Sequence, residues 1–256
     1  MHAIVVEQLG GPEELRVAER PTPQPGLGEI RVEVSVAGVN FMDTGTRRFG
    51  PPTGRLPVVP GVEGAGRVSA LGDGVTEFAV GDRVSWVYAY GSYAEQLVLP
   101  AESAVPVPDD ISDEVAASVM MQGITAHHFA TEAKAQIAHQ VGADHFLVST
   151  GDAFVEPVLE LTDGDGVHTV FDGGGETTFR ASLRVLRRNG TLLHYGAVIG
   201  AAPVVNLREL PRSVKICYPV FRDHIPTHEA LLRHSAEIFR MVQNGRLRVE
   251  IEEAAG

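Results

Sequence analysis

One stretch of the chain, VHTVFDGGGETTFRASLRVLRRNGTLLHYG at residues 167–196, constrains the fold more than any other. An apolar, β-branched run ends at Asp172, three glycines follow, and a helical pattern leads to Asn189-Gly190 and a second apolar run. Strand, tight turn, helix and strand in this order form the crossover unit of a parallel sheet. The stretch therefore predicts an α/β domain.

The glycines of this turn have two interpretations. A helix N-terminus after a glycine-rich turn can receive a phosphate, because its free N–H groups and the helix dipole favour an anion. However, GGGETT lacks the third glycine of the G-x-G-x-x-G fingerprint, and no acidic residue follows about 20 positions later. We favour a tight strand-to-helix turn, with a phosphate loop as the alternative.

The first part of the chain has a different sequence pattern. Residues 2–110 contain short apolar or alternating runs separated by Gly and Pro clusters, which is typical of a closed or partly closed β-barrel. Ser112 then offers an N-cap, followed by Asp113 and Glu114 in the first helical turn. We expect two domains, a β-barrel at 1–115 and an α/β domain at 116–256.

Composition narrows the functional classes. The 256 residues are 44% apolar, and no apolar run approaches the ~20 residues that span a bilayer. The formal net charge of −12 disfavours nucleic acid or an anionic membrane as a partner. Cys217 is the single cysteine, so a disulfide within the chain and a Cys-rich zinc site are excluded. We expect a cytoplasmic protein whose partner is a small molecule or another protein.

Few residues suggest chemistry by themselves. His224 and His228 have helical spacing, but Pro226 between them breaks the helix that would place both on one face. No metal site is expected. Asn40 and Asp43 follow an apolar strand, where they can form part of a site or simply cap the next element.

Short motifs along nearly the whole chain resemble those of the zinc-independent quinone oxidoreductases of the medium-chain dehydrogenase/reductase superfamily. The motifs are GVNFMDTG (38–45), PGVEGAGRV (60–68), VGDRV (80–84), GSYAEQ (91–96), MQGITA (121–126), GADH (142–145), VFDGGG (170–175), LRRNGTLLHYG (186–196) and YPVFRDHI (218–225). The resemblance implies a GroES-like β-barrel beside a Rossmann-type parallel sheet. It also implies hydride transfer from NADPH to a quinone or an activated enone, and a homodimer. Val62 stands where zinc-dependent relatives carry a histidine ligand, so no zinc is implied.

The same resemblance assigns roles to individual positions. The catalytic residues would be Asn40 and Thr125. The substrate pocket would include Asp43, Gln122 and Tyr218, while Gly45 departs from a tyrosine found in some members. The cofactor would be bordered by Lys134, Gly173 and Gly196.

Two departures from the family pattern affect this expectation. Between Ala126 and Gly142 the chain lacks a strand, an A-x-x-G-G-V-G loop, a helix and a second strand that relatives have, and this loop cradles the pyrophosphate in relatives. The tail after Ile251 is also shorter. The Rossmann domain is therefore expected to be abridged, with NADPH affinity lowered.

Three functional hypotheses follow. The leading one is an NADPH-dependent quinone or enone reductase that needs no metal. The second is a small-molecule binding protein or cofactor-independent enzyme derived from that family. The third is an inactive, incomplete product.

Overall fold

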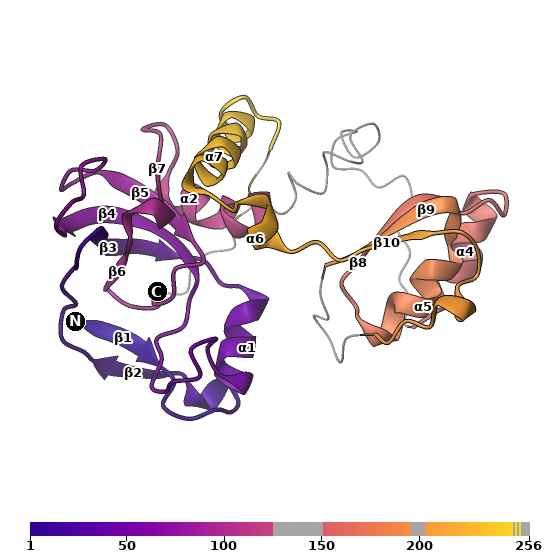
Figure 1. Cartoon of the computed structure of the whole chain (residues 1–256), viewed down its shortest axis with the longest axis horizontal. Coiled ribbons are helices and arrows are strands. Elements are labelled where there is room, and N and C mark those ends of the chain that lie inside the picture. The colour runs from indigo at the N-terminus through magenta and orange to yellow at the C-terminus, as the bar shows by residue number, and fades with distance from the viewer. Residues whose placement is uncertain (125–150, 196–202, 248, 250, 252–256) are drawn as a thin grey trace. The chain divides into compact units, whose positions relative to one another are not determined.

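The computed structural model describes residues 1–124, 151–195, 203–247, 249 and 251. The chain folds into two compact units, one formed by Met1–Phe129 with Ile225–Gly256 and the other by Ala130–His224 (Figure 1). The C-terminal segment therefore returns to the first unit. The expected domain limits at 1–115 and 116–256 stay a prediction.

The first unit is built on antiparallel strands. A five-stranded sheet has the order β6-β3-β4-β5-β7 and a separate pair joins β1 to β2. Figure 1 shows this pair lying across from the larger sheet. The strands are β1 (His2–Val5), β2 (Arg16–Glu19), β3 (Glu29–Ala37), β4 (Glu63–Leu71), β5 (Arg83–Val87), β6 (Gln96–Pro100) and β7 (Ala104–Pro106).

The expected barrel is only partly closed in the described part of the chain. The two sheets are linked by isolated bridges, Ala3 to Ala94 and Val6 to Val58, rather than by a continuous ladder. The sheet closes around one apolar cluster because alternate side chains of its strands point inward. The cluster contains Ile30, Val32, Val68, Phe78, Val84, Trp86, Ala89, Leu97, Leu99, Ala101 and Ala104.

Helices cover the ends of this unit. They are α1 (Phe41–Phe49), α2 (Asp113–Val119) and α7 (His228–Gln243), with 3-10 turns η1 (Pro12–Glu14) and η2 (Ala101–Ser103). Ser112 Oγ accepts a hydrogen bond from Val115 N at 3.3 Å, and Thr227 Oγ1 accepts one from Ala230 N at 3.2 Å. Both side chains cap their helices, and the Ser112 N-cap stands where the sequence predicts it.

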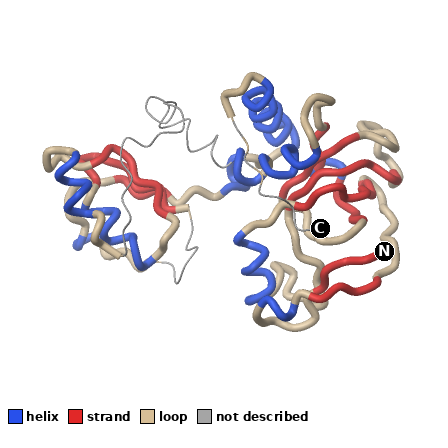
Figure 2. The backbone as a smooth tube through the Cα atoms, turned by 180° about the vertical axis from the view of Figure 1, so that it is seen from behind, coloured by secondary structure: helices blue, strands red, loops and turns tan. Residues whose placement is uncertain are grey.

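The second unit is a small parallel α/β layer. Its sheet has the order β10-β9-β8, with β8 (Val167–Asp172), β9 (Leu186–His194) and β10 (Lys215–Cys217). Helices α4 (Val155–Leu161) and α5 (Glu176–Arg184) pack against it, and η3 (Leu207–Glu209) and α6 (Phe221–His224) complete the unit. Figure 2 shows the three strands in red beside α4 and α5 in blue. The β8–α5–β9 crossover confirms the prediction from residues 167–196.

Core packing explains why this crossover forms. Phe179 and Leu183 of α5 pack against Leu186 and Leu192 of β9. The spacing of four in the helix and the even spacing in the strand place these side chains on facing surfaces. Each fully buried side chain of this size stabilises the fold by about 1.5–3 kcal/mol relative to exposure.

Candidate active site

The first unit contains a cluster of polar side chains around Glu63, the first residue of β4. Glu63 has no exposed surface. Its Oε1 accepts a hydrogen bond of 2.8 Å from Asn40 Nδ2, and its Oε2 accepts one of 2.7 Å from Met121 N. Met121 begins a helical stretch at 121–124, so the carboxylate satisfies an N–H group at a helix start. Three segments that lie far apart in the sequence meet at this one side chain.

Gln122 completes the contact between these segments. In one orientation its amide nitrogen donates to Asn40 Oδ1 at 3.1 Å. In the opposite orientation the nitrogen donates to Glu63 Oε1 at 3.2 Å and to Ser118 O at 2.9 Å. Asn40 is half-buried and Gln122 is exposed, so both amides can also reach a ligand.

Asp43 lies on the adjacent helix α1 and accepts a hydrogen bond from the backbone at the start of that helix. Its Oδ2 accepts hydrogen bonds of 2.8 Å from Asn40 N and from the Tyr93 hydroxyl. Its Oδ1 has no hydrogen-bond partner among the residues that the structure describes. The capping alternative for Asn40 and Asp43 is therefore observed, and it coexists with the Asn40 side-chain bond to Glu63.

Burial controls the ionisation of this cluster. It raises the pKa of Glu63, and it outweighs the hydrogen bonds from Asn40 and Met121 that favour the carboxylate. Burial likewise raises the pKa of Asp43 against the opposing effect of Asn40 and Tyr93. Burial and the neighbouring Asp43 raise the pKa of Tyr93, so its hydroxyl keeps its proton at neutral pH. The cluster offers neutral donors and acceptors above two carboxyl groups that retain protons more strongly than usual.

Two glycines create the space for these side chains. A Cβ on Gly38 would collide with the Glu63 side chain. Gly61 has a φ of 87°, and a Cβ there would lie 2.6 Å from the Tyr93 ring. Gly38 belongs to the sequence motif at 38–45 and Gly61 to the motif at 60–68. Close packing therefore explains why glycine stands at these two positions.

The second unit has its own polar group at the carboxyl ends of β8 and β9. Asp172 is 3% exposed and accepts hydrogen bonds from Gly174 N, Thr178 Oγ1 and Ser182 Oγ. His194 is also buried, and its Nδ1 lies 3.6 Å from Asp172 Oδ1 without a hydrogen bond. Ligands of parallel α/β sheets bind at this carboxyl edge, so the edge is where a cofactor is expected.

The glycines after β8 are explained first by packing. A Cβ on Gly173 would lie 2.8 Å from the Tyr195 ring, and Gly175 has a φ of 68° at the N-cap of α5. These contacts support the interpretation of a tight turn. Tyr218 is 64% exposed, and its ring centroid lies 5.9 Å from that of His194.

The structure thus brings together Asn40, Asp43 and Gln122 from the predicted set. Gly173 and Tyr218 lie in the other unit, and Thr125, Lys134 and Gly196 lie outside the described residues. Glu63 and Tyr93 were missed, although both stand in motifs that carry the family resemblance. A carboxylate between a buried valine and a glycine at the start of a strand, in VEG, was the available signal for Glu63.

The described segments contain no set of side chains arranged as metal ligands. Among those residues, no group of three or more His, Cys, Asp and Glu side chains is placed to hold a metal ion. Val62, the residue at the expected ligand position, is fully buried in the first unit. Likewise, within the described residues no helix is both long enough and apolar enough to cross a bilayer.

Fold and cluster together define a two-part dehydrogenase-type oxidoreductase. Residues 26–109 match the family model of the alcohol dehydrogenase GroES-like domain, and residues 124–234 match that of the zinc-binding dehydrogenase domain. A quinone oxidoreductase of Pseudomonas aeruginosa is 31% identical over 95% of this chain and 89% of its own length. The chain belongs to the quinone oxidoreductase family.

Two further relatives describe the range of this family. A 2-haloacrylate reductase of Burkholderia is 29% identical over 96% of this chain and 89% of its own length. A mycobacterial protein solved in complex with NADPH has a TM-score of 0.87 and is 33% identical. The match covers 98% of this chain and 91% of the mycobacterial one. This likeness supports the family fold for the chain.

Proposed function

We propose that this protein is an NADPH-dependent reductase of quinones or activated enones that uses no catalytic metal. The observation that carries the proposal is the Asn40–Glu63–Gln122 cluster, in which two accessible amides stand over a buried carboxyl group. Family membership supplies the reaction class, and the relatives include quinone and haloacrylate reductases.

The donor set fits the carbonyl groups involved. Asn40 and Gln122 each carry an amide that can donate to a quinone carbonyl and can both donate to and accept from a carboxamide. The bound cofactor supplies the hydride. Glu63 holds the Asn40 amide in one orientation, because its Oε1 accepts one of the two Nδ2 protons. Fixed amides stabilise developing negative charge on the acceptor oxygen without reorganising during the reaction.

Asp43 and Tyr93 act further from the acceptor. Their hydrogen bond fixes the start of α1 and so the position of Asn40. We assign them as positioning residues. Because the Gln122 side chain is exposed, water reaches the site and would supply the proton that completes the reduction.

Cofactor affinity is proposed to be weak. The glycine turn at 173–175 is filled by Tyr195 and Thr178 rather than open for a pyrophosphate. The alignment with the Pseudomonas relative extends over 288 positions and includes 95% of this chain, so it is longer than the 256 residues of the whole chain. That difference supports the loss of a segment that relatives use. We further propose a cytoplasmic homodimer, with Gly173 and Tyr218 bordering the cofactor, and Thr125, Lys134 and Gly196 completing the site.

One experiment tests the function directly. The full chain is titrated with NADPH by calorimetry, and NADPH oxidation is followed at 340 nm with 1,4-benzoquinone as acceptor. Binding with quinone-dependent loss of absorbance is expected. Thermal stabilisation by a quinone without any NADPH binding would replace this proposal with a non-redox binding function.

A further inference from the structure

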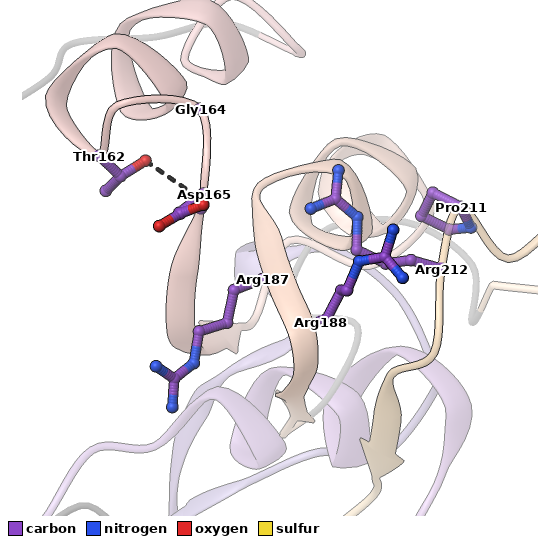
Figure 3. A pocket seen from close by; sticks show the side chains of 8 residues that line it. Thr162, Gly164, Asp165, Arg187, Arg188, Pro211 and Arg212 are labelled. Carbon is purple, nitrogen blue, oxygen red and sulfur yellow. Dashed lines mark hydrogen bonds between the residues drawn. The ribbon is translucent and has the colours of Figure 1, made fainter.

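A cavity of about 730 Å³ lies at one edge of the three-stranded sheet, entirely within the second unit. Figure 3 shows the side chains around it. Its lining consists of Thr162, Gly164, Asp165, Gly166, Arg187, Arg188, Pro211 and Arg212.

This edge is the amino-terminal one. The lining residues at 162–166 precede β8, Arg187 and Arg188 stand near the start of β9, and Arg212 precedes β10. All three strands are parallel, so their starts share one edge. Asp172 and His194 end their strands at the opposite edge, roughly 17 Å away for a six-residue strand. The cavity is therefore separate from the edge where the cofactor is proposed to bind.

The charge of the lining is unusual for this chain. Three arginines against one aspartate leave a net charge of +2 around the cavity, in a protein with a formal charge of −12. None of these arginines forms an ion pair within the described segments. On the neighbouring helix α5, by contrast, Arg180 pairs with Glu209 at 2.9 Å and Arg184 with Asp152 at 3.3 Å.

The backbone under these arginines is fixed by hydrogen bonds. Asn189 N donates to Ser213 O at 2.7 Å, which ties β9 to the segment that carries Arg212. Gly166 N donates to Thr162 Oγ1 at 3.1 Å on the other side. In Figure 3, Arg188 and Arg212 extend into the same region and Arg187 extends from β9 in another direction. The backbone that carries these arginines is therefore held in place, while the side chains of Arg187 and Arg188 are exposed to solvent.

We propose that this cavity binds an oligophosphate, either a free pyrophosphate or the phosphate chain of a nucleotide. Guanidinium groups bind phosphate oxygens through paired N–H donors, and the net positive charge of the lining favours an anion. The volume exceeds that of a single phosphate and admits a diphosphate with its water. Arg188 and Arg212 would provide the main contacts, and Arg187 would contribute at longer range.

Calorimetric titration of the full chain with sodium pyrophosphate at low ionic strength tests the proposal. One saturable site per chain is expected, and its affinity should fall as salt is raised. The double variant R188Q/R212Q should bind at least ten-fold more weakly. The control R180Q removes an ion-paired arginine from the same unit and should bind as the wild type does.

Further arms identify the source of the phosphate and separate this site from the cofactor. Tighter binding of ATP than of pyrophosphate would indicate a nucleotide, and equal affinities would indicate that the phosphates alone are recognised. The variant R188K/R212K keeps the charge but loses the paired donors, so intermediate affinity is expected. NADPH oxidation should be unchanged in R188Q/R212Q. No saturable binding by the wild type, or equal binding by R188Q/R212Q, would overturn the proposal.

Discussion

The Asn40 side chain donates a 2.8 Å hydrogen bond to Glu63, a carboxyl group with no exposed surface. The two residues are 23 positions apart, at the start of α1 and the start of β4. Because the Glu63 carboxyl group is buried, its ionisation is energetically coupled to the residues that donate hydrogen bonds to it. Substitutions at and around this pair therefore give the most direct tests of the structure.

The substitution Glu63→Gln is expected to have a pH-dependent cost. Burial raises the pKa of Glu63 above its ordinary 4.5, so the folded state holds the proton more tightly than the unfolded state. The wild type is then favoured most at or below pH 4.5 and loses this contribution as the pH rises through the folded pKa. Glutamine stands in for the neutral form. Urea unfolding should show the advantage of the wild type over E63Q shrinking as the pH rises from 4.5 towards neutrality.

The substitution Asp113→Asn should show the opposite pH dependence. Burial alone would raise the pKa of Asp113, but hydrogen bonds and charge from Arg83 lower it overall, with Arg83 Nη2 2.6 Å from Asp113 Oδ1. Its contribution is present above pH 3.8 and is lost as the pH falls through the folded pKa. Equal pH profiles for D113N and E63Q in the same unfolding series would contradict both assignments.

The substitution Tyr93→Phe removes a hydrogen bond from a buried carboxyl group. Asp43 would keep only the bond from Asn40 N at Oδ2, so we expect a loss of about 1–3 kcal/mol in the free energy of unfolding. Tyr90→Phe is the matched control, because the Tyr90 hydroxyl has no hydrogen bond to any residue in the described part of the chain. A double-mutant cycle with Asp43→Asn measures the coupling. Additive effects would show that the two side chains do not interact.

Gly61→Ala and Gly81→Ala form a pair that separates steric from conformational cost. Both glycines have positive φ, 87° and 99°, which costs an alanine about 1–2 kcal/mol. Only at Gly61 would the new Cβ meet a neighbour, the Tyr93 ring at 2.6 Å. G61A should therefore be less stable than G81A by about a further 1–3 kcal/mol in denaturant unfolding. Equal stabilities would mean that Tyr93 does not occupy this position.

The substitution Asn40→Ala is expected to impair turnover more than folding. It removes the fixed amide over Glu63, and losing one such donor typically lowers kcat by about 10²–10³-fold. Steady-state reduction of 1,4-benzoquinone measures the effect, with circular dichroism as the check on folding. Gln8→Ala, which removes only the two exposed hydrogen bonds from Gln8 Nε2 to the Glu14 carboxylate, is the control. An unchanged kcat in N40A would remove Asn40 from the mechanism.

Local signals account for much of the fold that could be predicted. Ser112 and Thr227 begin helices because their side chains bond to the first free N–H groups, a preference visible in the sequence. The run from Val167 to Gly175 predicted β8, the turn and α5. Helix α1 was not predicted, because it is short, contains Gly45 and exposes both Phe41 and Phe49.

The candidate site was predictable only through resemblance. Asn40 and Gln122 were expected to lie together, and Gln122 reaches Asn40 across 82 positions of sequence. Glu63 carries the site but looks like an ordinary polar residue in the sequence. Its hydrogen-bond partners include Asn40 and Met121, and Met121 lies 58 positions further along the chain. No local pattern records such contacts, since they exist only after β4 and the helical stretch at 121–124 have packed together.

Trp86 provides a spectroscopic consequence of the core around β5. It is the only tryptophan in the chain, it is fully buried, and its Nε1 donates to Ser92 Oγ at 2.9 Å. Its fluorescence reports on the first unit alone, because residues 130–224 contain no tryptophan. Fluorescence emission excited at 295 nm therefore follows the unfolding of the first unit. Far-ultraviolet circular dichroism follows the unfolding of both units. Separate midpoints in the two signals would resolve the two units as independent folding transitions in the intact chain.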